Sequence, residues 1–133
     1  MMLIKELRLK SEEDMFKLAE EIANELTGKE VICLKGNLGA GKTTFVKGLA
    51  KAMGIEKGYQ VRSPTFTLVN EYPTKRGKLI HIDLYRVKDF DYTELIGEGI
   101  IAVEWEEKNN NCNYVIEIEI IGENERLVKV FKK

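Results

Sequence analysis

The sequence predicts an α/β domain of three layers, in which helices pack against a mixed, mostly parallel central sheet that also carries β-hairpins. Two observations lead to this prediction. Segments with apolar residues at helical spacing alternate with short apolar runs of strand length, and a glycine-rich stretch separates one such run from a helix-forming segment. The chain has 133 residues, a length that fits one domain, so we assign residues 1–133 to a single domain.

The N-terminal part is predicted to contain a strand followed by a helix. Residues 3–9 are typical of a short strand. Ser11 then begins a helix, because Ser11 and Asp14 form a variant of the capping box and acidic residues occupy the first turn. The apolar face of this helix repeats at helical spacing and comprises Met15, Leu18, Ala19, Ile22, Ala23 and Leu26. Gly28 fits the position that follows the end of a helix.

The rest of the chain is predicted to arrange further strands around a second helix. An apolar strand at 31–35 is followed by the glycine-rich stretch and by a helix at 43–53, which ends near Gly54. Residues 55–64 are predicted to be a loop, and residues 89–97 a short helix. The remaining strands are one apolar strand and two hairpins, at 100–103, at 65–72 with 78–84, and at 114–121 with 126–131.

The octapeptide GNLGAGKT at residues 36–43 matches the P-loop pattern and lies between a predicted strand and a predicted helix. A helix N-terminus offers unpaired N–H groups to a phosphate, and the glycines let the backbone approach it. We expect Lys42 to reach the β- and γ-phosphates of ATP and the Thr43 hydroxyl to ligate Mg²⁺. An ordinary glycine-rich turn is the alternative. The predicted nucleotide contacts in this stretch are Asn37, Leu38, Gly39, Ala40, Gly41, Lys42, Thr43 and Thr44.

Two acids stand at the ends of apolar strands. Asp83 ends the run 79–83, and Glu104 follows the run 100–103. In open α/β sheets, ligands bind outside the carboxyl ends of the strands, so both acids are expected beside Thr43 if their strands neighbour strand 31–35. One would bind Mg²⁺, directly or through water, and the other would orient a water molecule. The alternative for each is an acid that faces solvent.

Four other side chains are candidates for weaker reasons. The Thr65 hydroxyl, after Pro64, is predicted to sense the γ-phosphate, although a plain proline turn is the alternative. His81 is the only histidine and faces the side opposite its isoleucine neighbours, so we interpret it as a sheet-face residue with its hydrogen bonds satisfied. Trp105 is expected to pack rather than to stack on a base. Arg86 is either a phosphate or partner contact or an ordinary surface residue.

The composition excludes several classes of protein. The chain carries 21 basic and 22 acidic residues, a net charge of −1, which argues against a dedicated nucleic-acid surface. Cys33 and Cys112 lie far apart without CxxC spacing, so we predict neither a zinc site nor a disulfide framework, and Cys33 is expected in the core. The N-terminus lacks an apolar signal region, and no window reaches transmembrane length. We therefore expect a soluble protein of the reduced cytoplasm, without a membrane.

Taken in order, the segments GNLGAGKTTFVKGLA, SPTFTLVNEY, HIDLYR and IAVEW resemble the TsaE family, formerly YjeE. These are small bacterial P-loop ATPases of the tRNA threonylcarbamoyladenosine modification system. The resemblance extends from the Ser11 helix to about residue 131. The SPTFTLV and HIDLYR blocks are its most specific parts.

The resemblance implies a cytoplasmic ATPase that uses ATP and Mg²⁺ and assists a TsaB–TsaD pair, so that tRNA is met only through that complex. It implies that Thr43 and Glu104 hold Mg²⁺ and that Asp83 lies on the γ-phosphate side, which makes Asp83, Glu104 and Lys42 the expected catalytic residues. Glu12 matches a family position near the nucleotide. The usual EWP of the family is here Glu104-Trp105-Glu106, which affects the loop after Glu104 but not the acid itself.

Two other functions compete with a weak ATPase. A small P-loop kinase normally carries a lid with clustered arginines, and the five arginines here are scattered: Arg8, Arg62, Arg76, Arg86 and Arg126. A nucleotide-gated binding module with negligible hydrolysis would share the same loop. A GTPase is disfavoured because no NKxD-like segment follows the loop.

Overall fold

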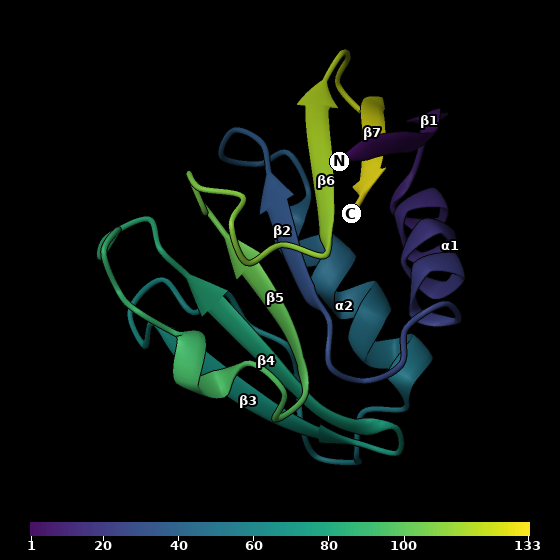
Figure 1. Ribbon diagram of the computed structural model, residues 1–133. Helices are drawn as coiled ribbons and strands as arrows, with labels where there is room; N and C mark the ends of the chain where they lie inside the picture. The colour runs from purple at the N-terminus through teal and green to yellow at the C-terminus, as the bar shows by residue number, and fades with distance from the viewer.

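The computed structural model describes all 133 residues and shows an open, twisted seven-stranded sheet with two α-helices (Figure 1). The elements in chain order are β1 (Met2–Leu9), α1 (Glu12–Ala23), β2 (Val31–Lys35), α2 (Lys42–Met53), β3 (Val69–Thr74), β4 (Gly77–Asp83), the 3₁₀ turn η1 (Thr93–Leu95), β5 (Ile100–Glu104), β6 (Tyr114–Ile120) and β7 (Arg126–Lys132). The α/β class predicted from the sequence is confirmed.

The sheet is mixed, with the order β1-β7-β6-β2-β5-β4-β3. Its four central strands, β6, β2, β5 and β4, run parallel to one another, whereas β3 pairs antiparallel with β4 at one end and β7 and β1 continue antiparallel from β6 at the other. Both predicted hairpins, β3–β4 and β6–β7, are present. Because β2, β4 and β5 are parallel and adjacent, their carboxyl ends meet at one edge of the sheet, where ligands of open α/β sheets bind.

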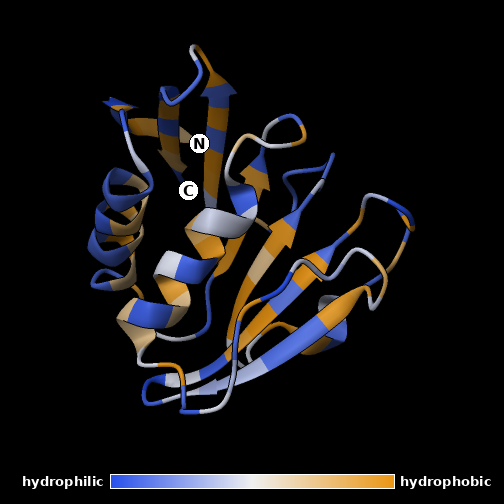
Figure 2. Ribbon diagram, turned by 180° about the vertical axis from the view of Figure 1, so that it is seen from behind, coloured by the Kyte–Doolittle hydropathy of each residue, from blue (hydrophilic) through white to orange (hydrophobic).

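The two helices cover the same face of the sheet, and α2 crosses in front of the strands in Figure 2. Their apolar sides join a core cluster of 25 buried residues. The opposite face, which includes Ile80, Ile82 and Val103, forms a second cluster of 10 buried residues beneath the irregular segments that follow β4 and β5. The third layer of the domain therefore contains η1 rather than an α-helix.

The helix predicted at 89–97 is reduced to η1. The Asp91 carboxylate accepts hydrogen bonds from the N–H and the hydroxyl of Thr93, at 2.9 and 2.7 Å, which starts a turn. Gly97 has φ of 97° and ends it. At Gly99, an added Cβ would lie 2.4 Å from the Lys78 carbonyl oxygen, so the chain there is already entering the sheet.

Helix α1 begins as predicted and ends earlier. The Ser11 hydroxyl accepts a hydrogen bond from the Asp14 N–H at 3.2 Å. The helix stops at Ala23, whose carbonyl accepts a hydrogen bond at 2.7 Å from Arg76 of the β3–β4 turn. The Glu30 carboxylate then accepts from three successive N–H groups, beginning with that of Thr27, and so forms a turn where the sequence suggested further helix.

The first strand of the β3–β4 hairpin starts later than predicted, at Val69 instead of residue 65. Residues 65–68 form a turn in which the Leu68 N–H donates to the Pro64 carbonyl at 2.8 Å, and Leu68 itself has a positive φ of 70°. Because this segment is not in the sheet, it is free to fold over the carboxyl ends of the strands.

Cys33 and Cys112 form a disulfide, so the prediction of no disulfide is wrong. Cys33 lies in the core, as expected, and both cysteines are fully buried. Parallel pairing places Cys33 of β2 opposite Val115 of β6, which brings the loop before β6 against β2 despite a sequence separation of 79. None of the helices has the length and apolar composition needed to cross a membrane.

Candidate functional site

The loop at residues 36–41 connects β2 to the N-terminus of α2, and glycine conformations shape its backbone. Gly39 and Gly41 have φ of 80° and 115°, values that residues with a Cβ rarely adopt, and Gly41 is the N-cap of α2. At Gly36, an added Cβ would lie 2.6 Å from the Ile118 carbonyl oxygen, so only glycine fits beside β6. The glycines therefore form a close-packed concave loop that leads into a helix N-terminus.

Lys42 is held inside this loop. Its Nζ donates to the carbonyl oxygens of Gly36 and Asn37, at 2.5 and 3.0 Å, and lies 4.2 Å from the centre of the Trp105 ring. Burial lowers the pKa of Lys42, and the charges of Glu104 and Asp83 oppose that effect. Asn37 takes part through its backbone carbonyl.

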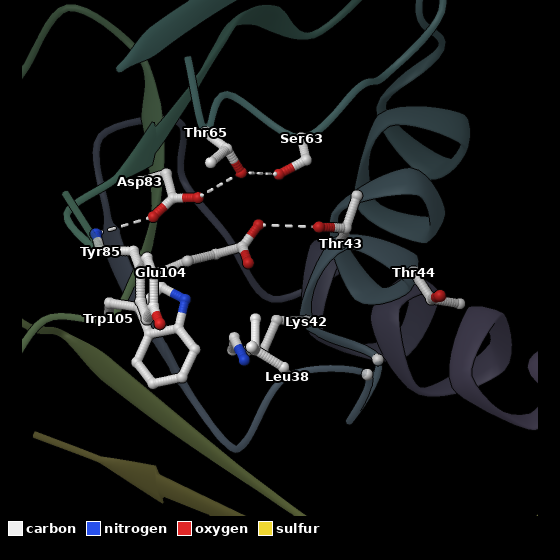
Figure 3. A pocket seen from close by; sticks show the side chains of 12 residues that line it. Leu38, Lys42, Thr43, Thr44, Ser63, Thr65, Asp83, Tyr85, Glu104 and Trp105 are labelled. Atoms are coloured by element: carbon white, nitrogen blue, oxygen red, sulfur yellow. Dashed lines mark hydrogen bonds between the residues drawn. The ribbon is translucent and has the colours of Figure 1, made fainter. Parts of the chain in front are cut away.

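The two predicted acids lie side by side. Asp83 and Glu104 are register partners at the carboxyl ends of β4 and β5, and both are buried. The Thr43 hydroxyl donates to Glu104 Oε2 at 3.0 Å, and the Thr65 hydroxyl donates to Asp83 Oδ2 at 3.1 Å (Figure 3). The structure thus brings these four side chains together, although they come from four different segments of the chain.

His81 lies beneath Glu104. Its Nε2 is 2.6 Å from Glu104 Oε2, and its Nδ1 is the only buried side-chain nitrogen or oxygen in the protein without a hydrogen-bond partner. The interpretation of His81 as a satisfied residue of the sheet face is therefore only half correct. It faces away from Ile80 and Ile82, as expected, but it contacts the site directly.

A cavity of about 290 Å³ opens between these groups. The predicted residues that line it are Leu38, Gly39, Gly41, Lys42, Thr43, Thr44, Thr65, Asp83 and Glu104, joined by Ser63, Tyr85 and Trp105. The Trp105 ring packs against Tyr85 with the ring centres 4.9 Å apart, so Trp105 forms a wall of the cavity. No arginine lines it. Arg86 instead lies over the exposed Phe66 ring, 5.3 Å from its centre.

A second cavity, of about 520 Å³, lies on the other side of the same loop. Glu12 lines it at the start of α1, together with Gly39, Ala40, Gly41 and Thr44 of the loop. Its remaining residues are Lys10 and Ser11 before α1, Met15 of α1, Glu123 and Asn124 of the β6–β7 turn, and Arg126 at the start of β7. The two cavities share the lining residues Gly39, Gly41 and Thr44.

Arg126 is a residue that sequence reasoning did not select. Its guanidinium donates to the carbonyls of Ala40 and Gly39, at 2.9 and 3.2 Å, and to two carbonyls of the β6–β7 turn. These hydrogen bonds connect the glycine-rich loop to β7, the last strand of the chain. No local sequence signal marks this role, because the contact joins segments 86 residues apart.

The donor set of the first cavity fits Mg²⁺ bound together with a nucleotide. Thr43 and Glu104 offer a hydroxyl and a carboxylate, the hard oxygen donors that Mg²⁺ prefers. No group of three or more His, Cys, Asp or Glu side chains in the protein could hold a metal ion by itself.

Comparisons with known proteins agree with one another. The profile of the family described as "Threonylcarbamoyl adenosine biosynthesis protein TsaE" matches residues 9–129. A protein of Aquifex aeolicus, named tRNA threonylcarbamoyladenosine biosynthesis protein TsaE, is 66% identical over the full length of both chains. A protein of the same name from Bacillus subtilis is 41% identical over 106 residues, which are 73% of this chain and 66% of the relative.

A solved structure shows the same fold. The crystal structure of Bacillus subtilis YdiB superimposes with a TM-score of 0.81 and 29% sequence identity, over 99% of this chain and 88% of that one. The overall fold is thus that of a known protein structure.

Proposed function

Since the chain belongs to the TsaE family, which takes part in the biosynthesis of threonylcarbamoyladenosine in tRNA, we propose that it binds Mg-ATP at residues 36–43 and hydrolyses ATP in support of that modification. The contact between Thr43 and Glu104 carries this proposal. It joins the hydroxyl of a P-loop to an acid from the neighbouring strand, which is the arrangement that P-loop NTPases use for Mg²⁺.

The phosphates are proposed to occupy the 290 Å³ cavity, against the N-terminus of α2. Phosphate oxygens would compete with the carbonyls of Gly36 and Asn37 for the Lys42 ammonium, which is already held at the centre of the loop. The lowered pKa of Lys42 supports this, because an anion would restore the charge stabilisation that burial removes.

Thr43 and Glu104 would hold Mg²⁺, directly or through water. When bound with ATP, the ion would neutralise charge that develops on the phosphates. Asp83 lies beside Glu104 and is proposed to orient the attacking water, while its bond to Thr65 connects it to the turn at 65–68. Lys42, Asp83 and Glu104 therefore remain the proposed catalytic residues.

The adenosine end of ATP is proposed to occupy the 520 Å³ cavity near Glu12. That cavity adjoins the one proposed for the phosphates across Gly39, Gly41 and Thr44, so one nucleotide can span both. The acidic Glu12 and the Asn124 amide offer hydrogen-bonding groups to a ribose or a base.

Hydrolysis is favoured over phosphoryl transfer to a small acceptor. A kinase stabilises the transferred phosphoryl group with clustered positive side chains, and no arginine lines the phosphate cavity. Arg76 and Arg126 are both occupied in binding backbone carbonyls. A binding module with negligible hydrolysis stays the second candidate, because two aligned acids can also serve a nucleotide switch.

The proposed partners are proteins like TsaB and TsaD, with tRNA met only through their complex. A net charge of −1 offers no strong attraction for RNA on this chain alone. We propose that the protein acts in the cytoplasm. The Cys33–Cys112 disulfide is compatible with that location, since both sulfurs are buried where a soluble reductant does not reach them.

The test combines nucleotide titration, phosphate release and co-sedimentation with TsaB and TsaD, each with ATP, ADP or no nucleotide. We expect Lys42→Ala to lose ATP binding, Thr43→Ala to lose mainly its Mg²⁺-dependent part, and wild-type hydrolysis to be faster with the partners. By linkage, a partner that prefers the ATP form must also tighten ATP binding. Unchanged ATP affinity in Lys42→Ala, or assembly indifferent to nucleotide, would contradict the proposal.

A further inference from the structure

His81 is a fully buried polar side chain at the site to which the proposed function gives no role. It lies on β4, two residues before Asp83 and on the same face of the sheet. Its register partner on β5 is Ala102, whose small side chain leaves the imidazole room to extend along the sheet toward Glu104. A leucine or isoleucine would fill this position in an ordinary sheet core.

The hydrogen bonds of Glu104 are concentrated on one oxygen. Oε2 accepts from the Thr43 hydroxyl at 3.0 Å and lies 2.6 Å from His81 Nε2. A carboxylate only accepts hydrogen bonds, so in this pair Nε2 of His81 is the donor, and Nδ1 has no partner in the protein. With both bonds on Oε2, the Glu104 side chain is held in one orientation and Oε1 has no protein donor.

The unpartnered Nδ1 indicates that packing alone does not account for the imidazole. Burying a polar nitrogen without a partner costs free energy, and an apolar side chain of similar size would avoid that cost. The compensating feature is the short bond from Nε2 to the acid that the proposed function makes a metal ligand. Partners of this kind orient metal ligands in many sites.

We propose that His81 is a positioning residue, which directs Glu104 Oε2 toward Thr43 and presents Oε1 to the Mg²⁺ that accompanies ATP. This inference rests on the proposed function. Its consequence is specific: His81 should matter for the gain in ATP affinity that Mg²⁺ provides, and not for the contacts that the glycine-rich loop makes with phosphate.

Three substitutions at His81 test whether a donor at the position of Nε2 is what Glu104 requires. His81→Gln places an amide N–H the same number of bonds from Cβ as Nε2. His81→Asn places it one bond short, and His81→Leu removes it. Gln and Asn are matched in chemistry and differ in reach, and thermal unfolding of each variant reports whether the fold survives.

The measurement is the affinity for a fluorescent ATP analogue, once with Mg²⁺ and once with EDTA. The quantity compared between variants is the affinity with Mg²⁺ divided by the affinity with EDTA. We expect the ratio to fall about 10-fold or more in His81→Leu and His81→Asn, to stay near the wild-type value in His81→Gln, and the affinity in EDTA to stay constant. The Mg²⁺ concentration for half-maximal phosphate release should rise in the same order.

Three results would overturn the inference. A wild-type ratio in His81→Leu would show that the bond does not serve the metal, and equal ratios in His81→Gln and His81→Asn would contradict the argument from reach. Equal losses with Mg²⁺ and with EDTA would show a merely structural role. A wild-type protein whose ATP affinity ignores Mg²⁺ would instead contradict the proposed function, and this outcome is visible before any variant is made.

Discussion

Reduction of the Cys33–Cys112 disulfide should strongly destabilise the protein. The bond closes a loop whose ends are 79 residues apart. The chain-entropy relation for a loop of about 80 residues gives a loss of about 4.5 kcal/mol at 25 °C when the cross-link is removed. Typical domains have roughly 5–15 kcal/mol of stability in total, so this loss is a large fraction. With an unfolding entropy of about 2.1 cal/mol/K per residue, the melting temperature should fall on the order of 15 °C.

The assay is urea unfolding of the oxidised and the reduced protein, followed by circular dichroism. Both sulfurs are buried, so the reductant is added to the unfolded chain before refolding. Cys33→Ala and Cys112→Ala serve as controls, because each removes the cross-link and should make the protein insensitive to reductant. The urea midpoint of each variant should lie slightly below that of the reduced wild type, since the variant also loses the packing of a buried sulfur.

Two results would refute this reasoning. Two free thiols in protein denatured without reductant would show that the disulfide does not form. Equal midpoints for oxidised and reduced protein, with the bond present, would show that the unfolded chain is not restrained by it. The free energy of unfolding should also fall more steeply with urea concentration in the reduced protein, because an unfolded chain without the cross-link exposes more surface.

Two further predictions concern the acids and the tryptophan of the site. Glu104→Gln and Asp83→Asn should each slow ATP hydrolysis about 100-fold, or about 3 kcal/mol of transition-state stabilisation, without loss of the fold. Phosphate release in the presence of TsaB and TsaD checks this, and a wild-type rate in either variant would remove that acid from the mechanism. Trp105 lies over the Lys42 ammonium, so its fluorescence should change when Mg-ATP binds and change less in Glu104→Gln. A flat titration at saturating nucleotide would show that the Trp105 wall does not respond to the ligand.

Contiguous sequence is enough to identify the glycine-rich loop and its helix. The P-loop pattern from Gly36 to Thr43 is contiguous in the sequence, and the dihedral freedom of Gly39 and Gly41 is a property of the residue type. The helix that follows was placed within one residue, from Lys42 to Met53, and Gly54 ends it in the left-handed conformation. Local rules suffice here because the chain makes these contacts with its near neighbours.

Segments whose conformation depends on distant partners were predicted less well. The stretch at 65–68 has the composition of a strand, but it leaves the sheet because Thr65 bonds Asp83 and Leu68 bonds Pro64. Helix α1 stops early, where Arg76 from a hairpin 53 residues away donates to the Ala23 carbonyl and the Glu30 carboxylate accepts from the N–H groups that follow. In both places a tertiary contact outweighs local propensity, which is worth only tenths of a kcal/mol per residue.

The residues alone show that a P-loop pattern lies between a predicted strand and a predicted helix, and that acids end two apolar strands. The folded structure is needed to show that β5 lies between β2 and β4, so that Glu104 meets Thr43 across 61 residues of chain and Asp83 lies beside Glu104. It likewise decided that Cys33 meets Cys112 and that Arg126 holds the loop. The physical reason is that the order of parallel strands is set by crossover connections and by burial of whole faces, and no pair of residues distant in sequence carries a local signal of its contact.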